Sequence, residues 1–321
     1  MSQAKAQPST PTGVRYVEID ENRAGQRLDN FLLSQLKGVP KSRVYRLLRR
    51  GEVRVNRGRV GPDYRLQEGD SVRLPPVREP PPRELTAKSS DYDWLSDRIL
   101  YEDEALVVLD KPAGFAVHGG SGVVIGVIEA LRLLRPQAPF LELAHRLDRS
   151  TSGCLVLAKS RPALLGLHAM LQAGEVDKRY LALIKGRWRG GAAELSAPLA
   201  RDRRRGSERL VGVSDDGKDA ATRFMPKGAY GPTTLVEIQL LTGRTHQARV
   251  HAAHLGHPIA GDDKYGDREL NRKLRPMGLR RLFLHAAALR FKHPLTGRKM
   301  EFEAPLPSEL STVLERLRRG Q

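Results

Sequence analysis

Hydrophobic positions in the first quarter of the chain follow a helical repeat twice and then a strand repeat. Two segments place apolar side chains three or four residues apart, and this spacing predicts helices at 25–36 and 40–50. Gly51 stands where the second helix should end. Two later segments alternate polar and apolar side chains and predict strands at 52–56 and 70–75. These four elements should form one compact α/β domain.

The remainder of the chain is rich in strand signals. Apolar runs or alternating side chains predict strands at 99–102, 105–110, 140–144, 154–158, 179–188, 233–241, 281–291 and 298–305. Helical periodicity is found at 126–136, 163–174, 249–256 and 308–320. Because strands and helices do not alternate regularly, we predict an α+β fold with a mostly antiparallel mixed sheet.

Proline content divides the chain between these two patterns. Five prolines fall in residues 75–82, which excludes a helix and favours an extended spacer. The predicted domains are a flexible tail, a small α/β domain, a proline-rich linker and a large α+β domain, at 1–13, 14–74, 75–95 and 96–321.

The net charge of the chain indicates the kind of partner rather than the fold. The 321 residues carry a formal net charge of +18, with 40% hydrophobic residues, so the protein is globular and favours polyanions such as nucleic acid. The helix at 40–50 places Arg43, Arg46 and Arg50 largely opposite its apolar side, with no acid at the i,i+4 positions that would neutralise them. A merely solvated face is the alternative, but the whole-chain charge favours RNA or DNA contact.

The cysteine count and the hydropathy of the chain indicate where in the cell the protein is located. Cys154 is the single cysteine, so no internal disulfide is possible, and the chain starts without an apolar segment. Apolar runs are too short to span a bilayer. We expect a cytoplasmic protein without a membrane partner.

A loop between two predicted core strands carries the strongest chemical signal, HRLDRSTSG at 145–153. Asp148 lies between Arg146 and Arg149, and Thr151, Ser152 and Gly153 follow it. A surface ion-pair cluster is the ordinary interpretation of such a group. A second polar cluster far along the chain favours a pocket for an anion or a nucleobase instead, and it comprises Arg244, His246, Gln247, Arg249 and His251.

Three other kinds of site were weighed. His251, His254 and His257 could suggest a metal, but their spacing does not bring all three into one ligand shell, so none is predicted. VHGGSG at 117–122 lacks the full phosphate-loop pattern. Ser152 with His145 and Asp148 could suggest a hydrolase triad, but the nucleophile-elbow motif is missing.

The motifs taken together resemble a known family. HRLDRSTSG resembles the signature of the pseudouridine synthases that modify RNA, in the branch with an H-R-L-D-x-x-T-S-G core. Further blocks match in the family's order, namely DKPAGFAVHGG, KRYLALIKG, GKDAATRF, TGRTHQARVH, GHPIAGDDKYG and RLFLHAAALRF. Residues 14–74 resemble the small S-four RNA-binding module. The resemblance covers nearly the whole chain, and it is greatest to members that modify bacterial large-subunit ribosomal RNA.

The resemblance implies roles for several residues. Asp148 would be the nucleophile on a flipped-out uridine, because a carboxylate can bond to the ribose anomeric carbon, or stabilise a cation there, and leave again. Arg249 would pair with Asp148 and favour its charged form, and Tyr180 would stack on the base. Arg146 and Arg149 would bind phosphates or enter the gap that the base leaves. Ala248 departs from the family, which usually has isoleucine or leucine there.

The implied partner is large-subunit ribosomal RNA or its assembly precursor, with RNA contacts expected from Arg43, Arg46, Arg50, Arg146, Arg149, Arg244, His246 and Gln247. ARDRRRG at 200–206 could add phosphate contacts. No cofactor is expected, since substrate and product are isomers, and we expect a monomer without an obligate protein partner. Two alternatives remain open: the same chemistry on other RNA, including transfer RNA, or a non-catalytic RNA-binding assembly factor.

Overall fold

The computed structural model describes residues 13–36, 38–77, 87–119, 125–201 and 210–320. Four sequence predictions fall wholly or partly outside these residues: most of the tail, much of the linker, the end of VHGGSG and most of ARDRRRG. Contacts divide the chain into two compact units, residues 1–87 and 88–321. Each unit is described by itself.

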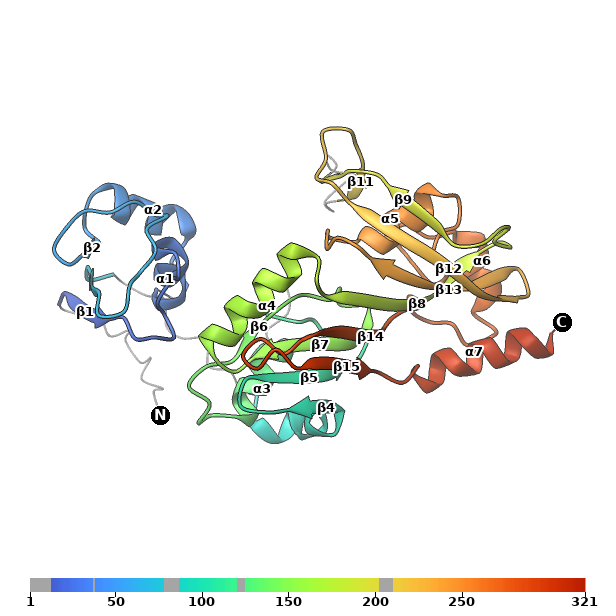
Figure 1. The fold of residues 1–321 in the computed structure, drawn as a ribbon, viewed down its shortest axis with the longest axis horizontal. Helices are drawn as coiled ribbons and strands as arrows, with labels where there is room; N and C mark the ends of the chain where they lie inside the picture. The colour runs from blue at the N-terminus through green and yellow to red at the C-terminus, as the bar shows by residue number, and fades with distance from the viewer. Residues whose placement is uncertain (1–12, 37, 78–86, 120–124, 202–209, 321) are drawn as a thin grey trace, which may run out of the picture. The chain divides into compact units, whose positions relative to one another are not determined.

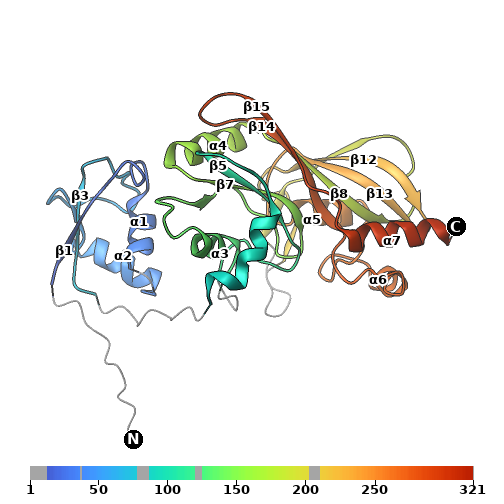
Figure 2. The same cartoon turned by 90° about the horizontal axis from the view of Figure 1, so that it is seen from below.

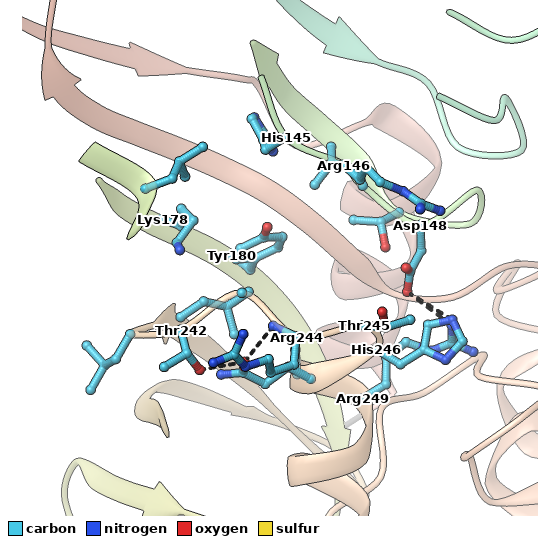
Figure 3. Close-up of a pocket in the computed structure, with 18 of the residues that line it drawn as sticks. His145, Arg146, Asp148, Lys178, Tyr180, Thr242, Arg244, Thr245, His246 and Arg249 are labelled. Atoms are coloured by element: carbon cyan, nitrogen blue, oxygen red, sulfur yellow. Dashed lines mark hydrogen bonds and ion pairs between the residues drawn. The ribbon is translucent and has the colours of Figure 1, made fainter. Parts of the chain in front are cut away.

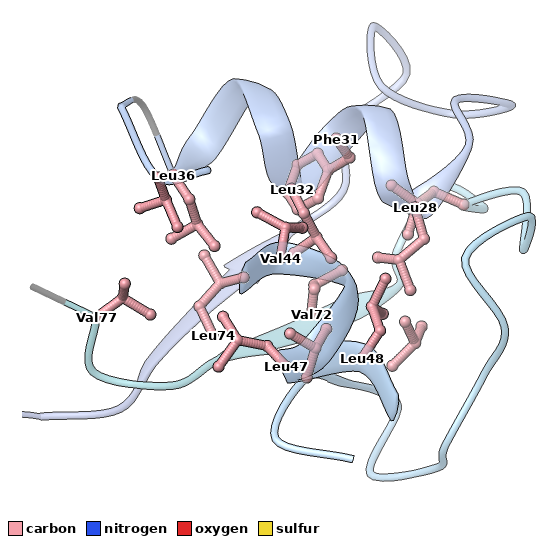
Figure 4. Close-up of a cluster of buried hydrophobic side chains, with 14 of the residues drawn as sticks. Leu28, Phe31, Leu32, Leu36, Val44, Leu47, Leu48, Val72, Leu74 and Val77 are labelled. Atoms are coloured by element: carbon pink, nitrogen blue, oxygen red, sulfur yellow. The ribbon is translucent and has the colours of Figure 1, made fainter. Parts of the chain in front are cut away.

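The first unit packs two helices on a small sheet. Its elements are β1 (Arg15–Glu18), α1 (Leu28–Gln35), α2 (Lys41–Arg49), β2 (Arg54–Val55) and β3 (Ser71–Leu74). The strands pair antiparallel in the order β1-β3-β2. Leucine, valine and phenylalanine side chains of α1, α2 and β3 interdigitate to form the core (Figure 4). Both predicted helices and both predicted strands are present.

The second unit is built on one large sheet (Figure 1). Its strands are β4 (Ile99–Glu102), β5 (Leu106–Lys111), β6 (Glu142–Leu143), β7 (Ser152–Ala158), β8 (Asp177–Lys185), β9 (Ala193–Ser196), β12 (Ala221–Tyr230), β13 (Thr233–Leu240), β14 (Leu284–Lys292) and β15 (Lys299–Glu303). The order is β4-β5-β7-β14-β8-β13-β12-β9, with β15 beside β14 and β6 beside β7. Within the described residues the only parallel pair is β7 with β14. The predicted α+β class is confirmed.

Helices and short strands cover this sheet. They are the 3-10 helix η1 (Ser89–Arg98), α3 (Val127–Leu134), α4 (Arg161–Ala173), α5 (Gln247–His254), α6 (Arg268–Leu274) and α7 (Ser308–Arg319), with β10 (Leu199–Arg201) and β11 (Val211–Val213) as a separate pair. Figure 2 shows α6 and α7 together on one side of β8, β13 and β12, where their leucines join one apolar cluster. Among the described residues, none of the helices has the length and apolar character needed to cross a membrane.

Within the described part of the chain, seven elements were not predicted: β1, β9, β10, β11, β12, α6 and η1. Two of them lie in stretches whose composition argues against a regular element. β12 contains Pro226 and Gly228, which argue against a strand in the sequence, but a bulge between these two residues lets the pairing with β13 continue. η1 begins at Ser89, inside the predicted linker, and its Leu95 side chain is fully buried within the second unit. The division into units falls between Ala87 and Lys88, also inside the predicted linker.

Candidate active site

Sheet register brings two distant segments to one place. β13 runs antiparallel to β8, and Gln239 near the end of β13 pairs with Arg179 near the start of β8. The turn 241–246 after β13 therefore lies beside the first residues of β8. The HRLDRSTSG loop ends where β7 begins, and β14 lies between β7 and β8 in the sheet. The two polar clusters predicted from the sequence thus face one another.

The loop that carries Asp148 is held at both ends. His145 accepts a hydrogen bond at Nε2 from the Val156 amide (3.1 Å). Burial, together with the nearby charge of Lys178, lowers the pKa of His145 to about 4, so the ring is neutral. Gly153 has φ +108°, and a Cβ there would lie 2.2 Å from the Ala286 carbonyl oxygen of β14. Only glycine fits at this contact, which accounts for the last residue of the motif.

Lys111 ties the other side of the loop to a turn. Its buried ammonium donates to the carbonyl oxygens of Pro112 (2.8 Å), Phe115 (2.9 Å) and Arg149 (3.3 Å). Burial lowers the pKa of Lys111 to about 7, although the charge of Asp148 opposes this shift. Arg149 also donates through Nε to the Gly114 carbonyl (2.8 Å). The backbone next to Asp148 is therefore anchored, and the Arg149 guanidinium is partly engaged in that anchoring.

Asp148 lines a cavity of about 700 Å³ and faces a buried arginine across it (Figure 3). Arg249 Nη1 lies 3.2 Å from Asp148 Oδ2. The same guanidinium makes two hydrogen bonds to Asp262, Nε to Oδ2 at 2.7 Å and Nη2 to Oδ1 at 2.8 Å. The Arg249 side chain is 9% exposed and that of Asp262 1%, whereas that of Asp148 is 26% exposed. One arginine thus bridges a buried carboxylate and one that is open to the cavity.

Hydrogen bonds and opposite charges offset the burial of Asp262 and Arg249. Burial alone would raise the pKa of Asp262, but the hydrogen bonds and charge of Arg249 lower it below its usual value. Burial likewise opposes the charge on Arg249, yet Asp262 and Asp148 raise its pKa. A bidentate pair also fixes the plane of the guanidinium. Asp262 therefore holds Arg249 in position for Asp148.

His246 adds a second nitrogen near the same carboxylate. Its Nε2 lies 3.8 Å from Asp148 Oδ2, and its Nδ1 is 2.8 Å from the Tyr265 hydroxyl. Burial lowers the pKa of His246, while the charge of Asp148 raises it. His246 has φ +56°, a conformation that side chains rarely adopt, and the strain lies at the start of α5 beside the cavity. The Tyr265 ring in turn lies under Arg249, whose Cζ is 5.0 Å from the ring centroid.

Tyr180 lies on the cavity wall between the two ends of the site. It is on β8, is 7% exposed, and its side chain is directed into the cavity (Figure 3). Burial and then the charge of Asp148 raise its pKa, so the phenol remains protonated. Ala248, the departure from the family pattern, also lines this cavity, as do the apolar side chains of Leu240 and Leu284.

The predicted RNA contact of Gln247 does not fit the structure. Its side chain is 2% exposed, and all of its hydrogen-bonding capacity is used within the protein. Oε1 accepts from the Thr242 hydroxyl (2.7 Å) and the Arg244 amide (3.0 Å). Nε2 donates to the Ala221 carbonyl (2.9 Å) and the Thr222 hydroxyl (2.8 Å). Gln247 holds the turn before α5 against β12, and RNA would have to break these bonds to reach it.

Most of the other predicted contacts are exposed, whereas His246 and Arg43 are partly buried. Arg146 and Arg244 line the cavity, and Arg244 donates through Nε to the Asp219 carbonyl (2.9 Å). In the first unit, Arg46 and Arg50 are exposed on α2 and Arg43 is half-buried. Arg50 Nη1 lies 3.9 Å from Glu52 Oε1. The buried residues of α2 are Val44, Leu47 and Leu48, so its basic and apolar residues separate as predicted.

Ser152 and His251 have other partners than a hydrolase triad or a metal site would require. Ser152 is buried and bonds to His285 (2.9 Å) and Arg281 (3.1 Å), while His145 bonds to a backbone amide, so no hydrolase triad forms. His251 uses both ring nitrogens in hydrogen bonds, to Thr222 and Ala197. No set of three metal-binding side chains occurs among the residues that the structure describes.

Three residues of the site were not identified from the sequence: Asp262, Tyr265 and Lys178. Asp262 and Tyr265 lie in GDDKYG, a block matched to the family without a role for either residue. Lys178 precedes Tyr180 by two residues, and side chains at this spacing in a strand share a face. That spacing was the available signal for Lys178, whereas Asp262 and Tyr265 required the tertiary contacts.

Comparisons with known proteins give matches along nearly the whole chain. The family model described as RNA pseudouridylate synthase matches residues 105–254, and the S4 domain model matches residues 26–72. Similar proteins named ribosomal large subunit pseudouridine synthase C occur in Yersinia pestis, 54% identical over 96% of this chain and 97% of that protein, and in Escherichia coli K12, 52% identical over 97% and 99%. The solved structure of human RNA pseudouridylate synthase domain containing 4 is 28% identical, with a TM-score of 0.60 over 72% of this chain and 96% of that one.

Proposed function

The chain belongs to the RNA pseudouridylate synthase family, and on that premise we propose that it isomerises particular uridines of large-subunit ribosomal RNA to pseudouridine. The relatives that match it over nearly their full length carry the large ribosomal subunit in their names. The reaction breaks the bond from ribose to N1 of uracil, turns the base and rejoins it through C5, while C5 loses a proton and N1 takes one up. No atom is gained or lost, so the proposal requires no cofactor.

One observation carries the assignment of the chemistry to Asp148. Its carboxylate is open to the cavity while its Oδ2 lies 3.2 Å from the buried Arg249 guanidinium. A base that fills the cavity excludes water, and this desolvation disfavours the charged form of the carboxylate. The fixed positive charge of Arg249 stabilises that charged form and so compensates for the lost water. In this proposal Asp148 adds to the ribose anomeric carbon, or stabilises a cation there, and later leaves.

Tyr180 and Arg146 receive roles around the flipped base. Tyr180 provides an aromatic face on the wall beside Asp148, suited to stacking on uracil. Arg146 is exposed where the cavity opens, and its side chain makes no hydrogen bond or ion pair with any described residue. It is therefore free to enter the gap left by the base. Arg149 is less suited to this role, because its Nε already binds Gly114.

Other contacts with RNA are proposed from exposed charge. Arg43, Arg46 and Arg50 of α2 and Arg244 at the cavity would bind phosphates, and His246 would contact the nucleotide beside Asp148. The residues proposed for the chemistry meet within one chain, and we propose that the protein acts as a monomer without an obligate protein partner. We place this activity in the cytoplasm, where bacterial ribosomes are assembled.

The test is carbodiimide mapping of pseudouridine on unmodified large-subunit ribosomal RNA, incubated with the purified protein and no added cofactor. New reverse-transcription stops at a few discrete positions would support the proposal and identify the uridines. Repeating the assay with ribosomal particles and with transfer RNA extends it to the other substrates. Absence of stops on every one of these RNAs would overturn the proposal in favour of a non-catalytic RNA-binding factor.

A further inference from the structure

Lys178 is a buried cation on the opposite side of Tyr180 from Asp148. Both Lys178 and Tyr180 lie on β8, two residues apart, and both side chains line the cavity. Figure 3 shows the Lys178 ammonium directed into the cavity, with Tyr180 between it and Asp148. Lys178 is 8% exposed. The cavity therefore has a carboxylate at one end and an ammonium at the other, with an aromatic ring between them.

The ammonium has no hydrogen-bond acceptor within the described parts of the chain. No hydrogen bond or ion pair joins Lys178 Nζ to any of those residues, although it lies close to the turn after β13: a Cβ on Gly243 would be 3.9 Å from it. Asp177, its neighbour in sequence, is engaged with Arg179 and Gln239. Burial lowers the pKa of Lys178, and the charge of Asp177 only partly opposes this shift.

Such a group is destabilising in a folded protein. The Lys178 side chain is largely buried, although it lines the cavity. A largely desolvated charge without a protein partner costs free energy of folding, and proteins retain one mainly where it serves a function. The cavity wall that Lys178 lines is also the wall on which Tyr180 would hold the base. The missing acceptor is therefore expected to be part of the substrate.

We infer that Lys178 is a further catalytic residue, which donates a hydrogen bond to the uracil carbonyl oxygen that lies across the ring from the ribose. This inference rests on the proposed function, because it takes the ribose to be at Asp148 and the base at Tyr180. With N1 bonded to the ribose, the carbonyl across the ring is C4–O4. Cytosine has an amino group at that position, which would face another donor, so the same contact selects uracil over cytosine.

The hydrogen bond from Lys178 to a uracil carbonyl oxygen can form both before and after the base turns. Turning uracil about the axis through N3 and C6 exchanges N1 with C5 and also exchanges O4 with O2. An oxygen acceptor therefore faces Lys178 before and after the turn. When the bond from ribose to N1 breaks, its electron pair stays with the ring, and the carbonyl oxygens share the negative charge. A fixed ammonium at that oxygen stabilises the detached base more than the bound nucleotide, and Lys178 transfers no proton.

The experiment compares Lys178→Met with Lys185→Met in single-turnover reactions. Lys185 is on the same strand, is 46% exposed and pairs with Asp267 outside the cavity, so its replacement removes the same charge from the chain. The substrate is a short transcript with one target uridine identified by the mapping above. At saturating RNA, Lys178→Met should react roughly 100-fold more slowly than the wild type, the effect of removing one donor to a developing oxyanion. Lys185→Met should react at the wild-type rate.

A second substrate locates the contact on the base. Replacing the target by 4-thiouridine weakens the acceptor across the ring, so the wild-type rate should fall by a larger factor than the rate of Lys178→Met. Equal factors for the two proteins would overturn the inference. So would a Lys178→Met variant that binds RNA weakly but reacts at the wild-type rate when saturated, because Lys178 would then bind a phosphate instead.

Thermal unfolding separates this role from a structural one. Removing an unpaired buried charge should leave the melting temperature of Lys178→Met equal to or above that of the wild type. A slow Lys178→Met variant with a lower melting temperature would contradict the inference. The Lys178→Gln variant keeps a neutral hydrogen-bond donor and should react at a rate between those of Lys178→Met and the wild type. If the wild type formed no pseudouridine in this assay, the proposed function itself would fail. An active wild type with an equally active Lys178→Met would refute only the role of Lys178.

Discussion

The arginines of α2 and Arg249 carry the same charge in opposite surroundings. Arg46 is exposed on the first unit, and its side chain makes no hydrogen bond or ion pair with the described residues. Arg249 is 9% exposed in the second unit and contacts two carboxylates. The first arrangement leaves the charge available to any polyanion nearby, whereas the second assigns it to particular atoms.

Exposed and buried charges suit different tasks, binding in the first case and chemistry in the second. An exposed charge has little desolvation cost and attracts polyanions at a distance. At about 0.1 M salt, this attraction is largely screened beyond about 10 Å. A buried charge must be paired to be tolerated, and its pairing fixes its geometry. Affinity for RNA is therefore expected to depend on surface arginines collectively, and the rate of reaction on a few buried contacts individually.

The substitution Asp148→Asn should separate reaction rate from RNA affinity most clearly. Loss of the nucleophile should lower the single-turnover rate by about 10⁴-fold or more, because an amide cannot take the place of the carboxylate in bonding to the anomeric carbon. RNA affinity should change little, since exposed arginines supply it. Filter binding and pseudouridine mapping measure the two effects. A variant that restored the full modification pattern in cells lacking the enzyme would refute the role of Asp148.

Asp262→Ala tests the buried side of the comparison. It leaves the Arg249 guanidinium without its bidentate partner, and removing one member of a buried pair typically costs about 3–5 kcal/mol of unfolding free energy. The rate should fall as well, since Arg249 loses its fixed position. Urea unfolding and single-turnover kinetics measure these effects.

Glu301→Ala is the matched control for Asp262→Ala. Glu301 pairs with Arg290 at 2.6 Å, but both side chains are about half exposed, at 54% and 44%. Its loss should change the unfolding free energy by less than about 1 kcal/mol. Equal costs for the two substitutions would remove the distinction between buried and exposed charge.

Arg43→Gln with Arg46→Gln tests the exposed side. RNA binding should weaken, and the slope of log affinity against log salt should become shallower by about 2, because each phosphate that the protein no longer neutralises reduces the slope by roughly one unit. The rate at saturating RNA should stay at the wild-type value. Lys292→Gln with Lys299→Gln removes two charges from the β14–β15 hairpin and should leave the slope less affected. An unchanged slope in the α2 variant would exclude this helix from the RNA interface.

The smallest effect is a pH dependence of stability. Since the folded protein lowers the pKa of Asp262 from 3.8, the pair with Arg249 contributes stability above that value and loses it as the pH falls further. The difference in unfolding free energy between the wild type and Asp262→Asn should therefore shrink in acid below pH 3.8. Denaturant titrations across this range measure it, and a constant difference would show that the charge of Asp262 contributes nothing.

Much of the fold was accessible from periodicity. The segments with clear helical or alternating patterns became the helices α1, α2, α3, α4, α5 and α7 and the strands β2 to β8 and β13 to β15. β12 was missed because Pro226 and Gly228 interrupt its pattern, and only pairing with neighbours on both sides makes it a strand. The predicted strand at 140–144 is reduced to Glu142–Leu143.

Family membership was also accessible, because it depends on short motifs in a fixed order. The predicted resemblance to RNA pseudouridine synthases and to the S4 module is confirmed by the family matches and by relatives about half identical over nearly the whole chain. The roles of individual residues are less directly accessible. Gln247 and Arg249 are neighbours in one motif, yet the first is used entirely within the protein and the second faces Asp148.

Most local elements, the excess of positive charge and the family can be read from the sequence, since each depends on residues close together in the chain or on composition. Which charges meet depends on the fold. Asp148 and Arg249 are 101 residues apart, and sheet register brings them to 3.2 Å. Asp262 and Lys178 gain significance only from burial, because a carboxylate or an ammonium acquires a strong need for a partner when the fold removes it from water.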